Sequence, residues 1–406
     1  MVLPKVNPLI RISGLLQALM IPLVGIAMAI VAWGIVSLRP TGNEPGSTTS
    51  PPVANPADDA ADGDLPPSGS AAFLIFTGET DDLVVRDPID EDDEGEVVTS
   101  FERHNGASPR GQASPDGTRV AVVHPALHAG ARLTIVTVAD GEEVMSPAVV
   151  DDNTTVAWER DGSGLVAVGS TGVDDSGRVS SSLLHINART GETRTLATFE
   201  GVYRVAPVGY SSDGESLFVV VIDQSGSELW VLGEEQREVV TSLSSGRTRD
   251  WALNPDGTVL AYIEVRSGAT VPTVGRAVFT ATGAPLHVSD TTSPQQGVVW
   301  RPGSVHPGFG GPGGTLRLED SISGGEMAAF LVPEAWSPDG TDLIARVVRA
   351  TITSNEPLET WEVFRGAEPL SAPGGSTGPA RAVLFDEQSE VSFLGWVTDT
   401  DAPTPE

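Results

Sequence analysis

Hydrophobic residues follow two different patterns along this 406-residue chain. Residues 14–38 form one apolar run without a charged residue, GLLQALMIPLVGIAMAIVAWGIVSL. From residue 71 to 399, short runs of apolar and β-branched residues instead alternate with turns containing Gly, Pro, Asn or Asp. The first pattern predicts a helix long enough to cross a bilayer. The second predicts an all-β domain built from short strands.

The strand-rich region contains a repeat, in which an Asp-Gly turn precedes an apolar run. EAWSPDGTDLIARVV at 334–348 is a good copy, and VVWRPGS around Gly303 is a degenerate one. Successive turn glycines lie between 37 and 52 residues apart, which matches one four-stranded propeller blade. The turn glycines are Gly117, Gly162, Gly214, Gly257, Gly303 and Gly340.

The residue types of the repeat explain why the chain turns there. In Ser-Pro-Asp-Gly, Pro presets φ at the second position of a type I turn, Asp suits the third and Gly the fourth. An aromatic residue such as Trp336 ends the preceding strand and is expected to pack between blades. A catalytic Asp is normally unique, so an Asp that recurs once per blade is expected to accept hydrogen bonds from turn N–H groups instead. These residues are Asp116, Asp161, Asp213, Asp256 and Asp339.

The two ends of the strand-rich region complement each other. Residues 71–100 contain three strands but lack the leading strand with its aromatic residue, and EVSFLGWVTD at 390–399 is such a strand. Pairing the two would close a ring and cover both sheet edges. The count then favours seven blades, although six or eight also fit, because VHPGFGGPGGT at 305–315 replaces the second strand of the sixth unit. The predicted fold is an all-β propeller of four-stranded antiparallel blades, preceded by one transmembrane helix and a disordered linker.

The apolar run near the N-terminus is expected to be an uncleaved signal anchor. The alternative is a cleaved signal peptide, since Ala-Met-Ala at 27–29 has the small-x-small form of a cleavage site, but the apolar run continues past it. Lys5 and Arg11 precede the run, whereas Arg39 stands alone after it. The positive-inside rule therefore places the N-terminus in the cytoplasm and the propeller on the extracytoplasmic side, periplasmic or extracellular, of a single-pass membrane protein.

These patterns divide the chain into five segments. The stretch after the anchor is rich in Pro, Gly, Ser, Thr and Asp, so it cannot offset its ordering entropy by burying apolar surface. The predicted organisation is a short cytoplasmic N-terminus at 1–13, a transmembrane anchor at 14–38, a disordered linker at 39–70, the β-propeller at 71–399 and a disordered tail at 400–406.

The composition limits the classes of partner and of chemistry that can be expected of this chain. The formal net charge of −31 argues against nucleic acid, whose phosphates would be repelled across most of the surface. The absence of cysteine excludes disulfides, thiolate nucleophiles and Cys-based zinc sites. Lys5 is the single lysine, which fits both salt tolerance and a GC-rich genome.

Candidate metal and phosphate motifs each fail a test. His124 and His128 have the spacing of helical metal ligands, but the Pro between them indicates a rim loop. The acidic segment DPIDEDDEGE at 87–96 lacks two calcium-loop ligands and is expected to be a solvated hairpin loop. The Gly-rich segment 306–315 lacks the Lys-Ser/Thr ending of a phosphate loop. It is expected to be a flexible loop that could serve recognition. We assign no catalytic, cofactor-binding or metal-ligating residue, and no cofactor.

Trp-Ser-Pro-Asp-Gly followed by an apolar strand, and LWV at 229–231, resembles the repeat of TolB-type and WD-repeat-like propellers. The resemblance covers residues 71–399, with good copies at 114–117, 254–257 and 336–340. Such blades occur in periplasmic TolB and in the propeller domains of prolyl-oligopeptidase and dipeptidyl-peptidase proteins. The resemblance implies the architecture but no particular function, because the same blades serve many roles. The Gly-x-Ser-x-Gly elbow of the peptidases is missing; GYSSD at 209–213 lacks its second Gly.

The sequence thus predicts a non-enzymatic, membrane-anchored extracytoplasmic propeller that acts as a protein–protein interaction or scaffold module of the cell envelope. Its partner would be an unknown protein or an envelope polymer. One alternative is a hydrolase or lyase with its site in the central channel, which predicts a cluster of His, Glu or Arg with perturbed pKa values on the innermost strands. The other is a small-ligand or glycan sensor.

Overall fold

The computed structural model describes residues 69–398 with several internal gaps. The predicted cytoplasmic N-terminus, anchor and tail at 1–13, 14–38 and 400–406 lie outside the described residues, as does the linker as far as residue 68. Within the described part of the chain, no helix is long and apolar enough to cross a membrane. The residues not described inside 69–398 are 91–92, 104–108, 126–129, 171, 174–178, 235, 289–292, 313–314, 318–321, 324–328, 350–357, 366–379 and 386–389.

Short antiparallel strands, joined by tight turns, make up the described residues. They form seven sheets, six of four strands and one of five. We call these sheets blades I to VII in chain order, and in blades II to VII the innermost strand precedes the turn of the repeat. Ser70, placed at the end of the linker by the sequence, is already the first residue of a strand.

The strands of the first three blades, from the centre of the ring outward, are β29 (Val391–Val397), β1 (Ser70–Phe76), β2 (Thr80–Arg86) and β3 (Glu96–Glu102) in blade I; β4 (Arg110–Ala113), β5 (Arg119–Pro125), β6 (Ala131–Thr137) and β7 (Glu143–Met145) in blade II; and β8 (Ala157–Trp158), β9 (Gly164–Val168), β11 (Val179–Asn187) and β12 (Thr193–Glu200), with β10 (Gly172–Val173) beside β11, in blade III.

The strands of the other four blades are β13 (Arg204–Tyr210), β14 (Leu217–Ile222), β15 (Ser227–Leu232) and β16 (Arg237–Ser244) in blade IV; β17 (Arg247–Leu253), β18 (Val259–Val265), β19 (Thr273–Phe279) and β20 (Pro285–Leu286) in blade V; β21 (Gln296–Val299), β22 (Gly308–Gly310), β23 (Thr315–Arg317) and β24 (Ile322–Ser323) in blade VI; and β25 (Ala329–Trp336), β26 (Leu343–Arg349), β27 (Leu358–Arg365) and β28 (Ala380–Phe385) in blade VII.

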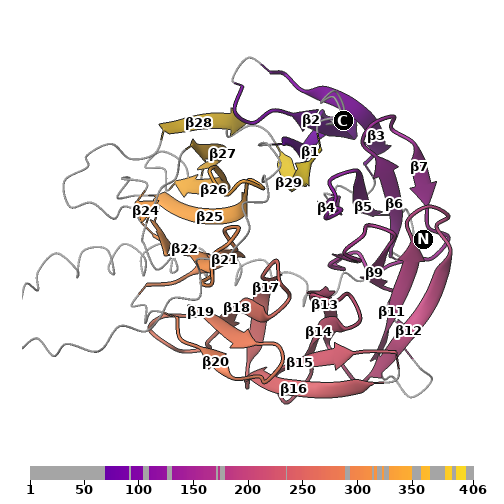
Figure 1. Cartoon of the computed structure of the whole chain (residues 1–406), viewed down its shortest axis with the longest axis vertical. Coiled ribbons are helices and arrows are strands. Elements are labelled where there is room, and N and C mark those ends of the chain that lie inside the picture. The colour runs from indigo at the N-terminus through magenta and orange to yellow at the C-terminus, as the bar shows by residue number, and fades with distance from the viewer. Residues whose placement is uncertain are drawn as a thin grey trace, which may run out of the picture. The chain divides into compact units, whose positions relative to one another are not determined.

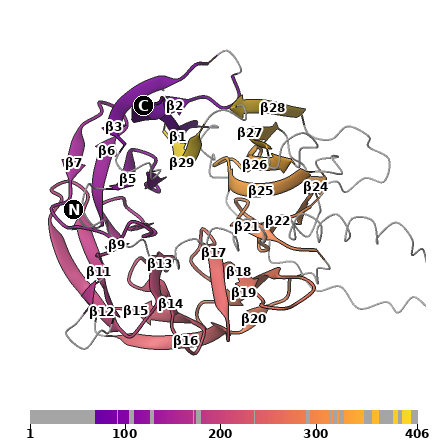
Figure 2. The same ribbon diagram turned by 180° about the vertical axis from the view of Figure 1, so that it is seen from behind.

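The hydrophobic core lies between blades rather than within a single central layer. Each pair of neighbouring blades shares one cluster of buried apolar residues, and the series of clusters leads from blade I through blade VII back to blade I. The central strands of the blades, such as LFVVVI in β14, are buried throughout because a blade packs on both faces. Figures 1 and 2 show the resulting ring from its two sides.

The ring closes by pairing the two ends of the domain, as the sequence predicted. β29 lies antiparallel to β1, with Ser70 opposite Val397 and Phe73 opposite Phe393. Phe73 is fully buried and contacts the rings of Phe393 and Phe385 at centroid distances of 5.5 and 5.0 Å. Blade I is therefore built from both ends of the propeller, so separating it requires breaking a strand pair as well as a hydrophobic cluster.

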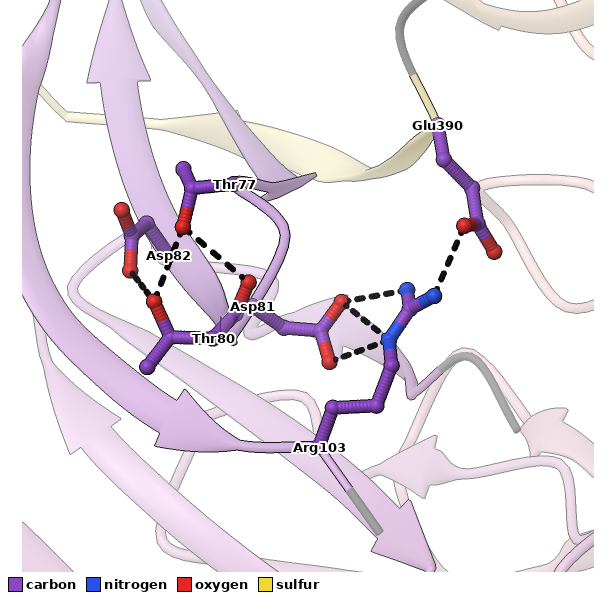
Figure 3. A network of polar contacts seen from close by, with 6 residues as sticks. All are labelled: Thr77, Thr80, Asp81, Asp82, Arg103 and Glu390. Atoms are coloured by element: carbon purple, nitrogen blue, oxygen red, sulfur yellow. Dashed lines mark hydrogen bonds and ion pairs between the residues drawn. The ribbon is translucent and has the colours of Figure 1, made fainter. Parts of the chain in front are cut away.

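A buried ion pair reinforces this closure (Figure 3). The Arg103 guanidinium donates to both carboxylate oxygens of Asp81, at 2.6 and 3.0 Å, and to Glu390 at 2.7 Å, just before β29. It also lies 3.7 Å from the ring centroid of Phe76. The hydrogen bonds to Asp81 raise the pKa of Arg103, against the opposing effect of burial. The same side chain thus joins β2 to the segment that enters β29.

The Gly-rich segment of blade VI is a correction to the sequence prediction. Residues 308–310 form β22, which pairs with β21 and β23, so the second strand is present rather than replaced by a loop. Phe309 is 3% exposed. A Cβ atom on Gly310 would lie 2.1 Å from the carbonyl oxygen of Leu331 in blade VII. The glycine lets two blades approach closely, a requirement that the sequence pattern of one strand does not reveal.

Candidate functional site

The recurring Asp residues have the structural role expected from their repetition. In the first turn, Gly117 N–H donates to the Ser114 carbonyl at 2.9 Å, and the Asp116 carboxylate accepts from the Ser114 hydroxyl and the Thr118 N–H at 2.5 and 3.1 Å. Burial alone would raise the pKa of Asp116, but the hydrogen bonds from Ser114 and Thr118 lower it. The carboxylates that accept in the same way are those of Asp116, Asp161, Asp213 and Asp339.

In the turn that begins at Asn254, another side chain accepts the hydrogen bonds of the turn. Asn254 replaces the serine, and its side-chain oxygen accepts from the N–H groups of Thr258 and Val259 at 2.8 and 2.9 Å. The backbone bond from Gly257 to Asn254, 2.8 Å, is retained. The amide therefore holds the turn by itself, which accounts for the serine-free copy.

The turns also connect one blade to the next. The Arg160 guanidinium donates to the carbonyls of Ser211 and Pro255, both at 2.7 Å, in the turns of the two following blades. Arg301 donates to the Gly340 carbonyl at 2.9 Å. We call the end of the ring that carries these turns the turn face. The contacts of Arg160 and Arg301 on this face therefore join neighbouring blades.

Aromatic residues at the ends of innermost strands pack between blades, as predicted. Trp158 donates its indole N–H to the Gln112 carbonyl of the preceding blade at 3.1 Å, and Trp300 does the same to Ala252 at 3.0 Å. Trp336 is 5% exposed and belongs to the cluster shared by blades VI and VII. The aromatic residue of the repeat therefore stabilises the packing of neighbouring blades.

Histidines and acidic loops give no metal site in the described residues. His124 lies near the end of β5, with its Nε2 3.1 Å from the Thr134 hydroxyl, and His128 lies outside the described residues. In the acidic hairpin, the Asp93 carboxylate accepts from the N–H groups of Asp87 and Gly95 at 2.6 and 2.8 Å. No group of three or more His, Asp or Glu residues in the described ranges is arranged to hold a metal ion.

Charged residues gather instead on the innermost strands, several of them toward the end opposite the turn face. We call this end the strand-start face, because the innermost strands begin there. Arg110 and Arg204 are the first residues of β4 and β13, Asp250 lies within β17, and Glu334 lies within β25. The sequence analysis assigned none of them.

Arg204 lies where two cavities adjoin. A cavity of about 210 Å³ is lined by Arg110, Asn153 and Arg204, and one of about 290 Å³ by Asn153, Tyr203 and Arg204. The Arg204 guanidinium donates to the Asn153 carbonyl at 3.2 Å and lies 5.1 Å from the ring centroid of Trp251. Burial lowers the pKa of Arg204, and the positive charge of Arg110 lowers it further.

Asp250 occupies a strained position between these arginines and blade VII. Its φ of 53° makes it the one described non-glycine residue with a positive φ, and it lies at an irregularity of the pairing between β17 and β18. Its carboxylate accepts from the Gly297 N–H of blade VI at 3.0 Å. Its charge acts on the pKa of Arg204 and on that of Glu334. Backbone strain of this kind often accompanies a functional requirement.

Glu334 is the most perturbed acid of the group. Arg346 donates to it at 2.6 Å and to Glu359 at 3.1 Å. Burial raises the pKa of Glu334, the charges of Asp250 and Glu359 act in the same direction, and Arg346 opposes them. A quarter of its side-chain surface remains accessible. Glu334, on the innermost strand β25, is therefore held in an ion pair with Arg346 of β26.

Sequence reasoning missed these residues because each is a single charge in a different repeat. The available signal was weak: a charged residue where an innermost strand begins, as in RGQA of β4 and RVAPVGY of β13. Only ring closure brings those strands to one centre.

Comparison with solved structures shows similarity in fold. The chain is similar to a prolyl endopeptidase, with 14% identity over 80% of this chain and 50% of that one and a TM-score of 0.53. It is similar to the acylaminoacyl peptidase of Pyrococcus horikoshii, with 12% identity over 74% and 53% of the two chains and a TM-score of 0.51. It also resembles TolB from Acinetobacter baumannii, with 14% identity over 67% and 62% and a TM-score of 0.46.

Sequence comparisons add no closer relative, since no family model and no curated protein matches the chain. The chain spans about half the length of the two peptidases and 62% of that of TolB. At these identities the similarities concern the fold alone, and the TolB-like β-propeller architecture expected from the repeat is confirmed.

Proposed function

We propose that this chain is a non-catalytic, membrane-tethered binding module, which holds a protein or an envelope polymer on the extracytoplasmic side through its strand-start face. The observation that supports this proposal most is the surface around Tyr203. Its side chain is 63% exposed beside Arg204, next to the two adjoining cavities. Exposed tyrosine and arginine beside a preformed pocket are typical of the residues that dominate binding energy at interfaces.

The support beneath this surface is rigid. β13, which begins at Arg204, pairs along its length with the fully buried strand β14. Val205 lies in the cluster shared by blades III and IV, and Val202 packs there as well. A partner would therefore meet a preorganised surface, which reduces the entropy lost on binding.

The proposed attachment to the membrane rests on the sequence. The apolar run at 14–38 would anchor the chain, and the polar segment at 39–70 would hold the propeller away from the bilayer. Lys5 and Arg11 favour a cytoplasmic N-terminus. This arrangement suits a module that captures a partner near the membrane surface.

Site-specific photo-crosslinking of the full chain in its native membrane tests the proposal. A photoreactive residue at position 203 is expected to yield one defined adduct on the extracytoplasmic side. The matched control is position 305, because Val305 is 71% exposed and follows β21 on the turn face. Equal labelling from both positions, or none from position 203, would contradict binding through the strand-start face.

A second candidate is an enzyme with its site at the centre of the ring, and one observation favours it. Glu334 has a raised pKa, remains accessible and lies on an innermost strand beside Arg346, a combination that suits a general acid. The test is a screen of the full chain against peptide and acidic-polysaccharide substrates. Turnover that disappears in Glu334→Gln while partner crosslinking persists would establish the enzyme, whereas turnover unaffected by this change would refute the central site.

A further inference from the structure

We infer that Arg110 and Arg204 form a binding site for a carboxylate group, which would be the anchoring group of the partner. This inference rests on the proposed binding function and names the chemistry of its site. Both arginines line the same cavity of about 210 Å³, together with Asn153, Thr154 and Thr155. The two arginines come from blades II and IV, and blade III supplies the polar wall between them.

The carboxylates of Asp151 and Asp250 act on the charge of Arg204 without forming an ion pair with it. Neither Arg110 nor Arg204 forms an ion pair with a carboxylate among the described residues. The arginines that do form ion pairs are Arg103, Arg249, Arg266, Arg276, Arg346 and Arg349.

Arg204 is held in place by contacts that leave its charge available. Its guanidinium bonds a carbonyl, that of Asn153, and lies near the Trp251 ring, so neither contact supplies a full negative charge. Burial is the main cause of the lowered pKa of Arg204, and the positive charge of Arg110 lowers it further. An anion between the two guanidiniums would relieve this repulsion and accept hydrogen bonds from both.

A carboxylate fits this site better than a phosphate. The guanidinium fork matches both groups, so hydrogen-bond geometry does not separate them. The surrounding protein carries a net charge of −31, and its repulsion grows with the charge of the ligand. The local attraction grows with the charge in the same way, but the cost of removing the charge from water rises faster than the charge itself, so a singly charged carboxylate is favoured in this cavity.

Calorimetric titration of the full chain in detergent micelles tests the site. The probes are acetyl-dialanine with a free carboxylate, its C-terminal amide and inorganic phosphate, all at the same ionic strength. The carboxylate form is expected to bind, and the amide is not. Arg110→Gln and Arg204→Lys are each expected to weaken binding by about tenfold or more, since each removes charge-assisted hydrogen bonds. Lysine rather than glutamine is used at position 204 because lysine retains the positive charge, which protects the variant against a loss of folding.

Arg132→Gln is the matched control, because Arg132 is an exposed arginine on β6 and its replacement also removes one positive charge. Equal loss of binding in this control, equal binding of the acid and the amide, or tighter binding of phosphate would overturn the inference. Failure of the probes to bind while crosslinking from position 203 still yields an adduct would overturn the carboxylate site and leave the proposed function standing. Binding of the carboxylate probe without a crosslinking adduct from position 203 would overturn the proposed function and leave the carboxylate site standing.

Discussion

At the scale of single residues, the same carboxylate performs one task in several turns. Asp116 accepts from a hydroxyl and an N–H group that the turn presents, and the turn glycine, with φ of 69°, allows the chain to enter the next strand. Charged residues elsewhere, such as Asp250 and Glu334, are not part of the repeated turn. Repetition therefore marks residues of the fold, and deviation from the repeat marks candidates for function.

Replacing the turn carboxylate is expected to have different effects in different copies. Asp116→Ala removes acceptors for Ser114 and Thr118 and should lower the free energy of unfolding by about 1–2 kcal/mol. Asp256→Ala should lower it by less than about 0.5 kcal/mol, because Asn254 already holds that turn. Urea unfolding of the two variants measures the difference. Equal losses would show that the Asn254 side chain does not replace the carboxylate.

The turn carboxylates also predict loss of stability in acid. The pKa values of Asp116, Asp161, Asp213 and Asp339 lie below the ordinary value of 3.8. Groups whose pKa is lower in the folded state stabilise the protein above their unfolded pKa, and this contribution disappears as the pH falls through the folded pKa. The melting temperature should therefore decrease below about pH 4. In the variant that replaces all four by Ala, it should decrease less steeply.

At the scale of strands, close approach between blades decides which sequence a strand can have. β22 consists of Gly-Phe-Gly, with Phe309 buried and Gly310 against the backbone of blade VII. Its composition resembles a loop because Gly310 is required for its small size rather than for strand formation. The pattern of one strand is therefore insufficient where a neighbouring blade sets the residue type.

Gly310→Ala is expected to destabilise the propeller strongly. The added Cβ atom would lie 2.1 Å from the Leu331 carbonyl oxygen, and backbone must move to accommodate it, at about 2–3 kcal/mol. The control is Gly214→Ala, where the Cβ atom has open space and only the φ of 76° is unfavourable, at about 1 kcal/mol. Chemical denaturation compares them. A smaller loss for Gly310→Ala than for Gly214→Ala would contradict the close approach of the two blades.

At the scale of the whole molecule, the two ends of the propeller depend on each other. Blade I joins β29 to β1, and Arg103 links β2 with the residue that precedes β29. Each blade buries its faces only against its neighbours, so opening one interface exposes two faces. Closure therefore determines whether the ring behaves as one cooperative unit.

Arg103→Ala is expected to lower the free energy of unfolding by about 3 kcal/mol or more, because it leaves Asp81 buried without its partner. Arg266→Ala is the control, since Arg266 pairs with Glu264 at a more exposed position and should contribute less than about 1 kcal/mol. Thermal unfolding followed by circular dichroism measures both. Similar losses would show that the closure pair is no more important than a surface pair.

The absence of cysteine permits a direct test of membrane topology. A cysteine introduced at Val305 of the full chain is expected to react with a membrane-impermeant maleimide in intact cells, because this side chain is 71% exposed. A cysteine at Val2 is expected to react only after lysis, as the positive-inside rule implies. Labelling of both positions in intact cells, or of neither, would contradict the proposed orientation.

The sequence by itself determined the features that depend on neighbours along the chain. Turn residues, apolar runs and their spacing identified the propeller, the strand that ends at Trp336 and the pairing of 390–399 with the first unit. These follow from local physics, since turn geometry and side-chain alternation act over a few residues. The net charge also argues against nucleic acid as a partner, and the absence of cysteine excludes disulfide and thiolate chemistry.

Only the tertiary structure decided which charges meet. Arg110, Arg204, Asp250 and Glu334 are separated by up to 224 positions in the sequence, yet the ring brings their strands around one centre. The same is true of β22, in which Gly310 is required by a strand that follows it in the next blade. Electrostatic coupling and close packing depend on distance in space, and a repeat pattern specifies the blade without specifying what its neighbours place beside it.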